Sequence, residues 1–426
     1  MRHPEQRVTE PKDLGILMNM NLQKIKLGEV CRFINGRAYS QPELLDSGKY
    51  KVLRVGNIFE GNHWYYSDME LDDDKYCNEG DLLYSWACTF GPYIWHGPKT
   101  IYHYHIWKVE PNQSLVDKHF LYYFLNHQTK GFMGSTHGST MIHITKENME
   151  NFEVLLPSLS DQKKIASVLS ALDDKIALNK KMNQKLEAMA KRLYDYWFVQ
   201  YDFPDKNGHP YKTTGGPMTY NPTLKREIPV GWEVSRFTDF GFFKNGVNYD
   251  KNETGDETVK IVNVRNISDS TTYFNIDELD DITLKSDDIQ KFIATPKDIL
   301  LARSGSPGAT RLLPHTDKKI IYCGFIIRYQ LNEQDLDKQL YLFHVLKGYE
   351  QVTSTQSAGS ILKNISQDTL NSLTVVMPQS NVLDDFNKKI APIYSMLRKN
   401  ISELNKLTIL RDKLLPLLMN GQVVVG

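Results

Sequence analysis

Few short motifs in this sequence combine residue types and spacing that could carry out catalysis. A base-flipping amino-methyltransferase needs an Asp/Asn-Pro-Pro-aromatic loop, and the nearest match, Asn-Pro-Thr at 221–223, lacks the second proline and the aromatic residue. A phosphate-binding loop needs the pattern GxxxxGK[ST], but the glycine-rich segment 305–309 has no lysine. No HExxH occurs, and Pro-Asp-Lys at 204–206, which has nuclease-like residue types, stands in a segment typical of a turn. The motifs therefore argue against a catalytic chain.

Metal chemistry has equally little support. His103 and His105 alternate on an expected strand and would share one face, with His96 nearby, but no carboxylate or cysteine stands at matching spacing. We favour a solvated or DNA-facing strand over a metal site. The four cysteines, which form no CxxC pair and suit a reducing compartment, are Cys31, Cys77, Cys88 and Cys323.

Composition narrows the function without deciding it. The 426 residues include 51 Lys and Arg and 51 Asp and Glu, so a protein that simply coats DNA, which would be basic overall, is disfavoured. A DNA reader with its basic residues grouped, or one that shares DNA contact with basic partners, remains allowed. The sequence shows neither a signal-type apolar core nor a run of transmembrane length. We therefore expect a cytoplasmic protein without a membrane partner.

The sequence is internally duplicated, so the elements that would position a functional site occur in two copies. Four short segments recur in the same order at slowly increasing offsets, as loop-length variation would produce, and that order makes chance matches improbable. The matching pairs are 51–58 with 260–267 (offset 209), 80–83 with 297–300 (217), 138–144 with 359–365 (221) and 156–157 with 377–378 (221). Each copy has the plan of an α+β domain of roughly 150 residues, which is a common domain size.

A long helix is predicted after each copy. Apolar residues recur there at spacings of three, four and seven, which is typical of a coiled-coil seam, and Ser158 with Asp161 can cap the first helix. The first stripe comprises Ile165, Leu169, Leu172, Ile176, Met182, Leu186, Met189 and Leu193. The second comprises Phe386, Ile390, Ile393, Leu397, Ile401, Leu404, Leu407, Leu414 and Leu417.

These stripes are too long for one globular domain to cover. Residues 160–197 alone would extend about 57 Å at ~1.5 Å per residue. Two unrelated core helices are an alternative, but antiparallel pairing of the two helices accounts better for the length. The region between the first helix and the second domain, 200–231, is rich in Pro, Gly, Thr and Tyr and is interpreted as a linker.

The linker region carries a family resemblance. Its series reads Trp-Phe-Val at 197–199, Asp-Phe-Pro at 202–204, Asn-Gly-His-Pro-Tyr-Lys at 207–212, Gly-Gly-Pro-Met at 215–218 and Ile-Pro-Val-Gly-Trp at 228–232. Together with the duplicated plan, this series resembles the specificity subunits of type I restriction–modification enzymes from about Met20 to Val423. One departure is that the first helix has Asp161-Gln162, and the second Val382-Leu383, where the family often has Glu-Gln.

The resemblance implies an α+β fold of two similar target-recognition domains separated by two long antiparallel coiled-coil helices. Its expected parts are a disordered leader (1–20), recognition domain 1 (21–157), helix 1 (158–199), the linker (200–231), recognition domain 2 (232–378), helix 2 (379–420) and a tail (421–426). It also implies that each domain reads one half of a bipartite double-stranded DNA target. Two methyltransferase subunits would dock on the helices and motor-nuclease subunits would join them. S-adenosylmethionine and ATP would belong to those partners, with no cofactor in this chain.

Candidate DNA contacts follow from chemistry, because Lys and Arg bind phosphates while Arg, Asn, Gln, Ser and Lys read base edges. Each candidate alone is more often a solvated surface residue, but the sets recur in equivalent segments. In domain 1 they are Arg54, Asn57, Trp64, Tyr65, Lys99, His103 and His105, with Ser135 and Ser139 in the polar loop 135–140. In domain 2 they are Arg265, Asn266, Arg303, Ser304, Ser306, Arg311, Ser360 and Lys363.

Antiparallel helices would place the two domains at opposite ends of the helix pair, which would then act as a ruler. The length of the pair would fix the number of base pairs between the two half-sites, a spacer that neither domain reads. Because the two domains differ in sequence, the target should be asymmetric. Two other classes stay open at this point. They are an enzyme fused to its own recognition domain, which the missing motifs disfavour, and a scaffold that binds proteins only. A recognition subunit of a related methyltransferase or restriction system is a further alternative.

Overall fold

The computed structural model describes residues 22–59, 61, 63–134, 144–249, 255–268, 271–356, 364–423 and 425. The chain divides into two compact units, which we call unit 1 (Met1–Ala177 with Leu407–Gly426) and unit 2 (Leu178–Lys406). The boundary falls inside both long helices, so each unit holds one globular part and a segment of each helix.

Unit 1 is built on two four-stranded sheets. Their hydrogen-bonded orders are β2-β9-β6-β7 and β4-β3-β8-β5, while β1 and β10 form an antiparallel ribbon. The strands are β1 (Gln23–Lys26), β2 (Cys31–Asn35), β3 (Tyr50–Leu53), β4 (Tyr65–Ser67), β5 (Tyr76–Cys77), β6 (Leu82–Ser85), β7 (Gly91–Ile94), β8 (Thr100–Tyr102), β9 (Ile106–Pro111) and β10 (Glu153–Leu156). Strand β6 is buried along its whole length, which fits its unbroken apolar run before Ser85.

The globular helices of unit 1 are α1 (Leu27–Val30), α2 (Val55–Phe59), α3 (Lys118–Gly134) and α4 (Lys146–Asn151). Helix α3 packs Phe120, Leu121 and Phe124 into the core beside the first sheet. The same core takes in Ile165 and Leu169, so the first long helix is fastened to this domain from its first turns.

Unit 2 repeats the plan. Its sheets have the orders β14-β20-β17-β18 and β16-β15-β19, with a β13–β21 ribbon and a β11–β12 hairpin. The strands are β11 (Met218–Asn221), β12 (Arg226–Pro229), β13 (Glu233–Arg236), β14 (Gly241–Asn245), β15 (Glu257–Val262), β16 (Asp280–Leu284), β17 (Ile299–Ala302), β18 (Thr310–Leu312), β19 (Ile320–Tyr322), β20 (Ile326–Leu331) and β21 (Thr374–Met377). The globular helices are α6 (Val264–Ser268), α7 (Ser286–Gln290), α8 (Gln339–Gln356) and α9 (Gln367–Asn371).

The internal duplication predicted from four short matches is confirmed by the topology. Both units have one parallel pair inside an otherwise antiparallel sheet, β3 with β8 and β15 with β19. An isolated parallel bridge also follows the equivalent strand in each, Arg37 with His103 and Val247 with Cys323. Such a mixed pairing is specific enough that two copies of it point to one ancestral domain.

A glycine marks the same close approach in both copies. A Cβ atom on Gly36 would lie 2.4 Å from the Tyr102 and His103 carbonyl oxygens, and one on Gly246 would lie 2.2 Å from that of Cys323. No side chain fits at such distances, so the Asn-Gly that ends β2 and β14 is required by the backbone of the neighbouring turn.

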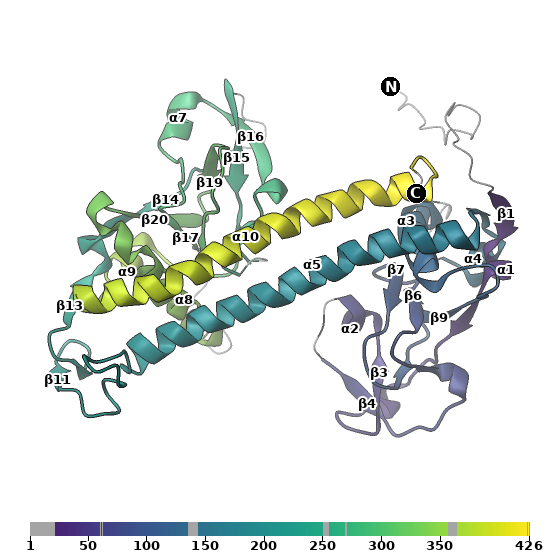
Figure 1. The fold of residues 1–426 in the computed structure, drawn as a ribbon, viewed down its shortest axis with the longest axis horizontal. Coiled ribbons are helices and arrows are strands. Elements are labelled where there is room, and N and C mark those ends of the chain that lie inside the picture. The colour runs from purple at the N-terminus through teal and green to yellow at the C-terminus, as the bar shows by residue number, and fades with distance from the viewer. Residues whose placement is uncertain are drawn as a thin grey trace. The chain divides into compact units, whose positions relative to one another are not determined.

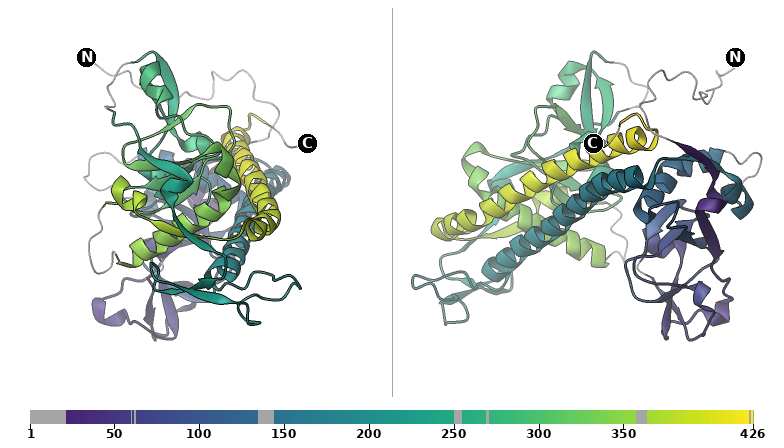
Figure 2. Two further views of the ribbon diagram at one scale, coloured as in Figure 1. Left: turned by 90° about the vertical axis from the view of Figure 1, so that its left-hand side faces the viewer. Right: turned by 45° about the vertical axis from the view of Figure 1, so that its right-hand side comes forward.

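Two long helices follow the two domains, α5 (Leu159–Tyr194) and α10 (Ser380–Met419), and they run side by side in Figures 1 and 2. In unit 1, Ile165 shares a core with Leu418. In unit 2, the Trp197 and Phe386 rings are 5.8 Å apart, and Leu186 shares a core with Leu397. Because the start of each helix meets the end of the other, the pairing is antiparallel, as predicted.

The seam differs in detail from the predicted stripe. Met182 and Met189 are 37% and 53% exposed, so their assignment to the seam was wrong. Asn179 is instead 2% exposed and donates a hydrogen bond to Glu403 Oε2 at 3.2 Å, and Ala190 is buried further along. Helical periodicity of 3.6 rather than 3.5 residues moves the contact line around the helix, which the apolar pattern alone did not reveal.

The segment expected to act as a linker, 200–231, packs into unit 2. Tyr201, Phe203 and Ile228 are buried in its core, and the Phe203 ring stacks on Trp232 at 5.1 Å. Asp202 accepts hydrogen bonds from the backbone N–H and the hydroxyl of Thr213, which ties the two ends of this segment together. The aromatic residues of the resemblance therefore serve packing.

Candidate nucleic-acid interface

Three segments of unit 2 meet through hydrogen bonds. They are the β17–β18 loop (303–309), the β19–β20 turn (323–325) and helix α6. The backbone N–H of Arg303 donates to the Phe325 carbonyl at 2.8 Å, and the Ser268 hydroxyl donates to Ser306 Oγ at 2.8 Å. These contacts bring the predicted residues Arg303, Ser304 and Ser306 together on one short loop.

Unit 1 has an equivalent meeting point, formed by the β6–β7 loop (86–90), the β8–β9 turn (103–105) and the segment that leads into α2, where the His103 N–H donates to the Leu53 carbonyl at 2.9 Å. The backbone N–H of Trp86 donates to the His105 carbonyl at 3.2 Å, which matches the contact between Arg303 and Phe325. The Trp86 indole N–H also donates to the Tyr104 carbonyl at 2.9 Å. We call these two equivalent sets of three segments the reading loops.

The reading loops share an uncommon backbone geometry. Cys88 has a φ of 63°, and Gly305, the residue at the same loop position in the other unit, has a φ of 79°. A left-handed conformation is uncommon for a residue with a side chain and is a form of backbone strain that collects at functional sites. The equivalence shows that the loop shape is kept even though its side chains differ.

The predicted asparagines Asn57 and Asn266 hydrogen-bond to the backbone of their own domains. Asn57 Oδ1 accepts the backbone N–H of Arg54 at 3.0 Å, and Asn266 Oδ1 accepts that of Asn263 at 2.8 Å. Asn57 Nδ2 then donates to the His63 carbonyl. Each amide therefore holds the start of its helix in place.

Arg311 lies inside unit 2 and away from solvent. Its guanidinium meets Glu350 at 3.0 and 3.2 Å and its side chain is 5% exposed. A buried, bidentate ion pair of this kind holds β18 against α8. Arg265 remains on the surface, where it pairs with Asp280.

The other predicted residues of domain 1 spread over its second sheet. The Arg54 guanidinium lies 5.1 Å from the Tyr65 ring centroid, while Lys51 lies 4.9 Å from that of Trp64. Lys99 lies 4.0 Å from the Tyr76 ring centroid, by the far end of β8. Arg54 and Tyr65 thus adjoin the reading loops, whereas Lys99 does not.

Among the histidines predicted on this strand, His103 is held as a neutral ring. Burial, together with His105 and Arg54 nearby, lowers the pKa of His103 to about 4. His103 Nδ1 accepts the backbone N–H of His105 at 3.4 Å, which also favours the neutral form. Among the described residues, no cluster of three or more His, Cys, Asp or Glu could hold a metal ion.

Ser135, Ser139, Ser360 and Lys363 lie outside the described residues. The residues just after Lys363 contact the reading loops of unit 2. Ser304 forms a β-bridge with Asn364, and the Ile365 N–H donates to the Arg303 carbonyl.

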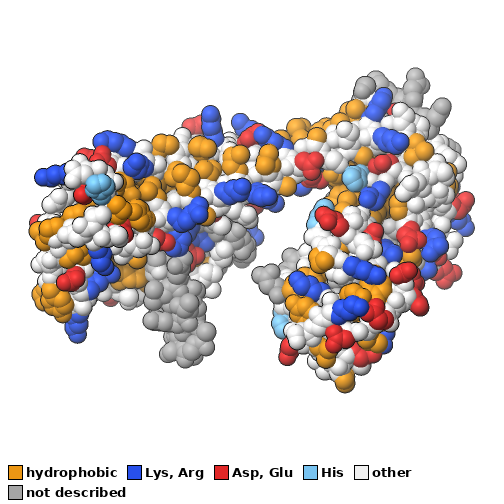
Figure 3. All heavy atoms as spheres, turned by 60° about the horizontal axis from the view of Figure 1, so that its bottom comes forward, with side chains coloured by type: hydrophobic (Ala, Val, Ile, Leu, Met, Phe, Trp, Pro, Cys, Tyr) orange, Lys and Arg blue, Asp and Glu red, His pale blue; other side chains and the backbone are white. Residues whose placement is uncertain are grey.

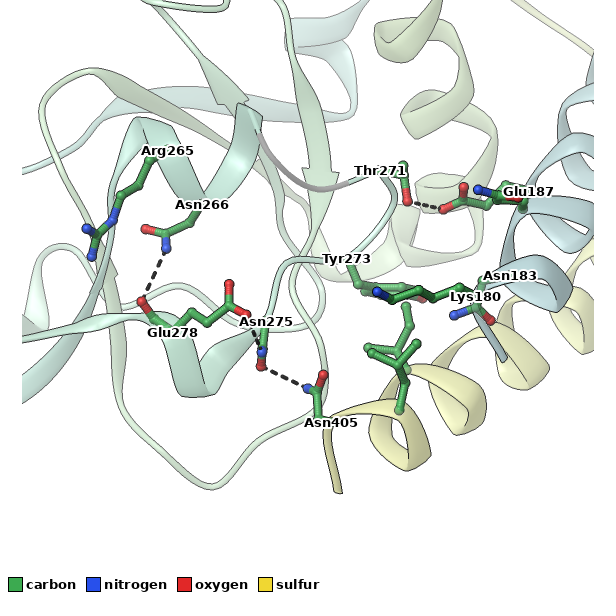
Figure 4. A pocket seen from close by; sticks show the side chains of 13 residues that line it. Lys180, Asn183, Glu187, Arg265, Asn266, Thr271, Tyr273, Asn275, Glu278 and Asn405 are labelled. Carbon is green, nitrogen blue, oxygen red and sulfur yellow. Dashed lines mark hydrogen bonds between the residues drawn. The ribbon is translucent and has the colours of Figure 1, made fainter. Parts of the chain in front are cut away.

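A polar groove of about 770 Å³ in unit 2 shows how the second domain is fastened to the long helices (Figure 4). Thr271 donates to Glu187 on α5, and Asn405 on α10 donates to Asn275 at 2.8 Å. In unit 1, Tyr123 donates to Asp173 at 2.7 Å and Asp173 also pairs with Arg411. Each domain is thus held to both helices by directional contacts that fix its orientation on them.

Charge is distributed unevenly along the chain. Helix α5 carries eight Lys and Arg against four Asp and Glu, and α10 carries seven against four, so the rest of the neutral chain is acidic overall. On the face drawn in Figure 3, basic and acidic side chains are interspersed. Among the described helices, none is long and apolar enough to cross a membrane.

Comparison with known proteins decides the family. The family model described as the type I restriction modification DNA specificity domain matches two stretches, residues 19–188 and 229–411. The chain belongs to this family. It is therefore a DNA specificity subunit of a type I restriction–modification system, and such a subunit is non-catalytic.

Curated relatives carry the same description. The MjaIX specificity subunit of Methanocaldococcus jannaschii is 26% identical over 321 residues, which cover 74% of this chain and 71% of that protein. The HindI specificity subunit of Haemophilus influenzae is 22% identical and covers 94% of this chain and 99% of its own. A crystal structure of the type I system S subunit from M. genitalium shares the fold, with a TM-score of 0.58 at 14% identity, covering 94% of this chain and 96% of that one.

Sequence reasoning on this specificity subunit missed three aromatic residues of the reading loops. Trp86, Tyr104 and Phe325 were not among the candidates, although the β8–β9 and β19–β20 turns join strands 220 residues apart that both read Ile-Tyr before the turn and Ile after it. That repeat would have aligned the two turns.

Proposed function

We propose that each recognition domain of this specificity subunit reads one half of an asymmetric, bipartite DNA target with its reading loops. The observation that carries the proposal is the pair of structurally equivalent loop sets with different side chains. Trp86 in one set stands where Arg303 stands in the other, and His105 where Phe325 stands. Because the two sets of reading loops have the same backbone arrangement but different side chains, they would recognise different half-sites.

The residue roles follow from their chemistry. In domain 2, Arg303 can hydrogen-bond a guanine edge, and Ser304 and Ser306 suit base or phosphate oxygens. In domain 1, Arg54 suits a phosphate, and the Trp86–Tyr104–His105 group offers apolar and hydrogen-bonding contact. Ser135, Ser139, Ser360 and Lys363, which lie outside the described residues, are proposed as phosphate contacts from their chemistry alone. Trp64, Tyr65, Lys99 and Arg265 are proposed as peripheral contacts.

Domain replacement tests this modular reading. Residues 21–157 are exchanged for the first domain of another family member, and methylated sites are mapped by sequencing in a host with the complete system. One half-site should change and the other should stay. A change in both halves, or in neither, would contradict separate reading by the two domains.

We further propose that two methyltransferase subunits dock on equivalent patches of the long helices. The α5 patch consists of Met189, Arg192 and Tyr196, beside a groove of about 700 Å³ that Lys389 and Ile393 also line. Met189 and Tyr196 are 53% and 39% exposed. Exposed apolar side chains next to the basic side chains of Arg192 and Lys389 favour a partner surface that is apolar and acidic.

The second patch, which we call the α10 patch, is the equivalent surface in the second half of the internal duplication. Helices α5 and α10 begin 221 residues apart, and at that offset Leu410, Lys413 and Leu417 correspond to the residues of the α5 patch. Leu410 is 46% exposed. Two equivalent patches on one chain support two copies of one partner. Those partners would bring S-adenosylmethionine, and motor-nuclease subunits would bring ATP.

Stoichiometry tests the docking proposal. Native mass spectrometry of the complex should show two methyltransferase subunits with the original chain, one with Leu410→Glu, and none when Met189→Glu is added. Ile409→Glu is the matched control, because Ile409 is 42% exposed on the neighbouring face of the same helix. Loss of both partners from Leu410→Glu alone would refute two separate patches.

The helix pair is proposed to set the unread spacer. Seven residues inserted beside Asn179 and seven beside its hydrogen-bond partner Glu403 keep the seam in phase and add about 10 Å. That length approaches three base pairs at ~3.4 Å each. The methylated motif should gain about three spacer bases with both half-sites unchanged. An unchanged spacer would refute the ruler, and seven residues inserted in the turn at Gly208 serve as the control.

A further inference from the structure

Phe325 is the most exposed phenylalanine among the described residues of unit 2. Its side chain is 61% exposed, although it lies between Cys323, which is 4% exposed, and Ile326, which is fully buried. Leaving a phenyl ring in water is unfavourable. An exposed ring at the centre of the reading loops, and not at a chain end, therefore points to contact with a bound partner.

The ring is carried by a rigid support. The turn is closed by the hydrogen bond from the Ile326 N–H to the Cys323 carbonyl at 2.9 Å, and the Cys323 N–H donates to the Val262 carbonyl at 3.0 Å. The Phe325 carbonyl accepts the Arg303 N–H. All three contacts fix the backbone on both sides of the ring, so little conformational freedom remains to be lost on binding.

The equivalent turn of unit 1 also exposes an aromatic residue. Tyr104 is 38% exposed, and its ring lies 4.0 Å from that of His105 and 6.0 Å from that of Trp86. In unit 1 the ring is thus supported by neighbours as a platform. In unit 2 the residue before Phe325 is Gly324, and position 303 is an arginine, so no aromatic residue stands at either equivalent position.

We propose that Phe325 is a wedge that enters the base stack of the DNA bound by the second domain. This inference rests on the proposed reading function of the loops. Apolar side chains that reach the base edges from a rigid turn can insert between base pairs and partly unstack them. Arg303, whose backbone is bonded to the same turn, would hold the adjoining base or phosphate while the ring enters. The wedge would therefore read how easily a base step opens, in addition to the hydrogen bonds that read its edges.

The test uses the complex of this chain with its methyltransferase subunits and a duplex containing the mapped target. 2-Aminopurine is placed in turn at each position of the second half-site, since its fluorescence rises when its neighbours unstack. The original complex should raise the signal at one step, and Phe325→Ala should remove that rise. Phe325→Ala should also weaken binding to the intact duplex by roughly 10-fold, the scale of one lost aromatic–base contact.

A pre-opened site provides the decisive comparison. A duplex with an abasic position at the identified step has already lost the stacking that the wedge must break, so the Phe325→Ala defect should shrink there to about 3-fold or less. Phe242→Ala is the matched control, because Phe242 is 48% exposed on β14 of the same unit and outside the reading loops. It should leave fluorescence and affinity unchanged.

The outcomes separate the wedge from the reading function on which it rests. If the original complex binds its target and Phe325→Ala leaves the fluorescence rise intact, the wedge is refuted while reading by the loops stands. If Arg303→Ala and Phe325→Ala both leave affinity and the methylated motif unchanged, the reading loops themselves are refuted.

Discussion

Removing Glu350, the ion-pair partner of Arg311, distinguishes a structural role of Arg311 from a DNA-binding role. A structural role predicts a loss of stability, whereas a DNA-binding role predicts a gain in DNA affinity. If Arg311 contacted DNA, removing its acidic partner would free a cation and raise DNA affinity. In the structure the Arg311 side chain is 5% exposed, and its guanidinium contacts Glu350 at 3.0 and 3.2 Å. Glu350→Ala would therefore leave a buried charge without its main partner.

The magnitude follows from that geometry. Breaking one side of a buried ion pair destabilises a protein by about 3–5 kcal/mol, and because Glu350 is itself 26% exposed, we expect the lower end, about 3 kcal/mol. For a unit of this size, ~3 kcal/mol corresponds to a fall in Tm of roughly 6–12 °C. The double variant Arg311→Met with Glu350→Leu removes both charges and should recover most of the loss.

Thermal unfolding followed by circular dichroism measures this effect, and DNA affinity of the reconstituted complex is measured on the same variants below their Tm. Glu350→Ala should lower the Tm with no gain in affinity. A variant that keeps its Tm and binds DNA more tightly would refute the assignment of Arg311 to the interior and return it to the interface.

Three further predictions concern packing, pH and docking. Gly246→Ala places a Cβ atom 2.2 Å from the Cys323 carbonyl oxygen, so the urea midpoint of the second domain should fall sharply, whereas Gly348→Ala, where no atom lies within 4 Å, should not lower it. Burial lowers the pKa of His344 to about 3, below its ordinary value near 6.5. Between these two pH values the unfolded chain binds a proton that the folded chain does not, so the free energy of unfolding should fall as the pH drops from 6.5 toward 3. His344→Gln should flatten that dependence when unfolding is measured as a function of pH. Met189→Glu should leave the Tm within about 1 °C, since Met189 is 53% exposed, yet lower the number of docked methyltransferase subunits from two to one in native mass spectrometry. A large fall in Tm would mean that Met189 belongs to the core.

The architecture could be predicted from sequence because duplication repeats every weak signal. Residues 51–58 and 260–267 resemble each other, and the structure places them in β3 with α2 and in β15 with α6. The helix seam was predicted well where Leu and Ile dominate, as at Leu169 and Leu397, which are fully buried. It failed where Asn179 replaces an apolar residue, because hydrophobic periodicity cannot identify a buried amide that has a partner on the other helix.

The site was less accessible to sequence reasoning because residue type does not reveal burial or prior partners. Arg311 and Asn266 have the chemistry of base readers, yet each is already engaged inside the fold. Phe325 was not among the predicted contacts, and an apolar residue next to Ile326 is typical of a core position in sequence. Its exposure depends on the turn that carries it, which is a tertiary property.

The central claim, that this chain specifies a target in two unequal halves, is tested most directly by mapping modified bases. The subunit and its methyltransferase partner are expressed in a host free of other methylation, and the genome is sequenced by a method that detects methylated bases. We expect one asymmetric motif made of two short half-sites separated by unread bases. A continuous motif, a palindrome, or methylation that does not depend on this subunit would contradict it.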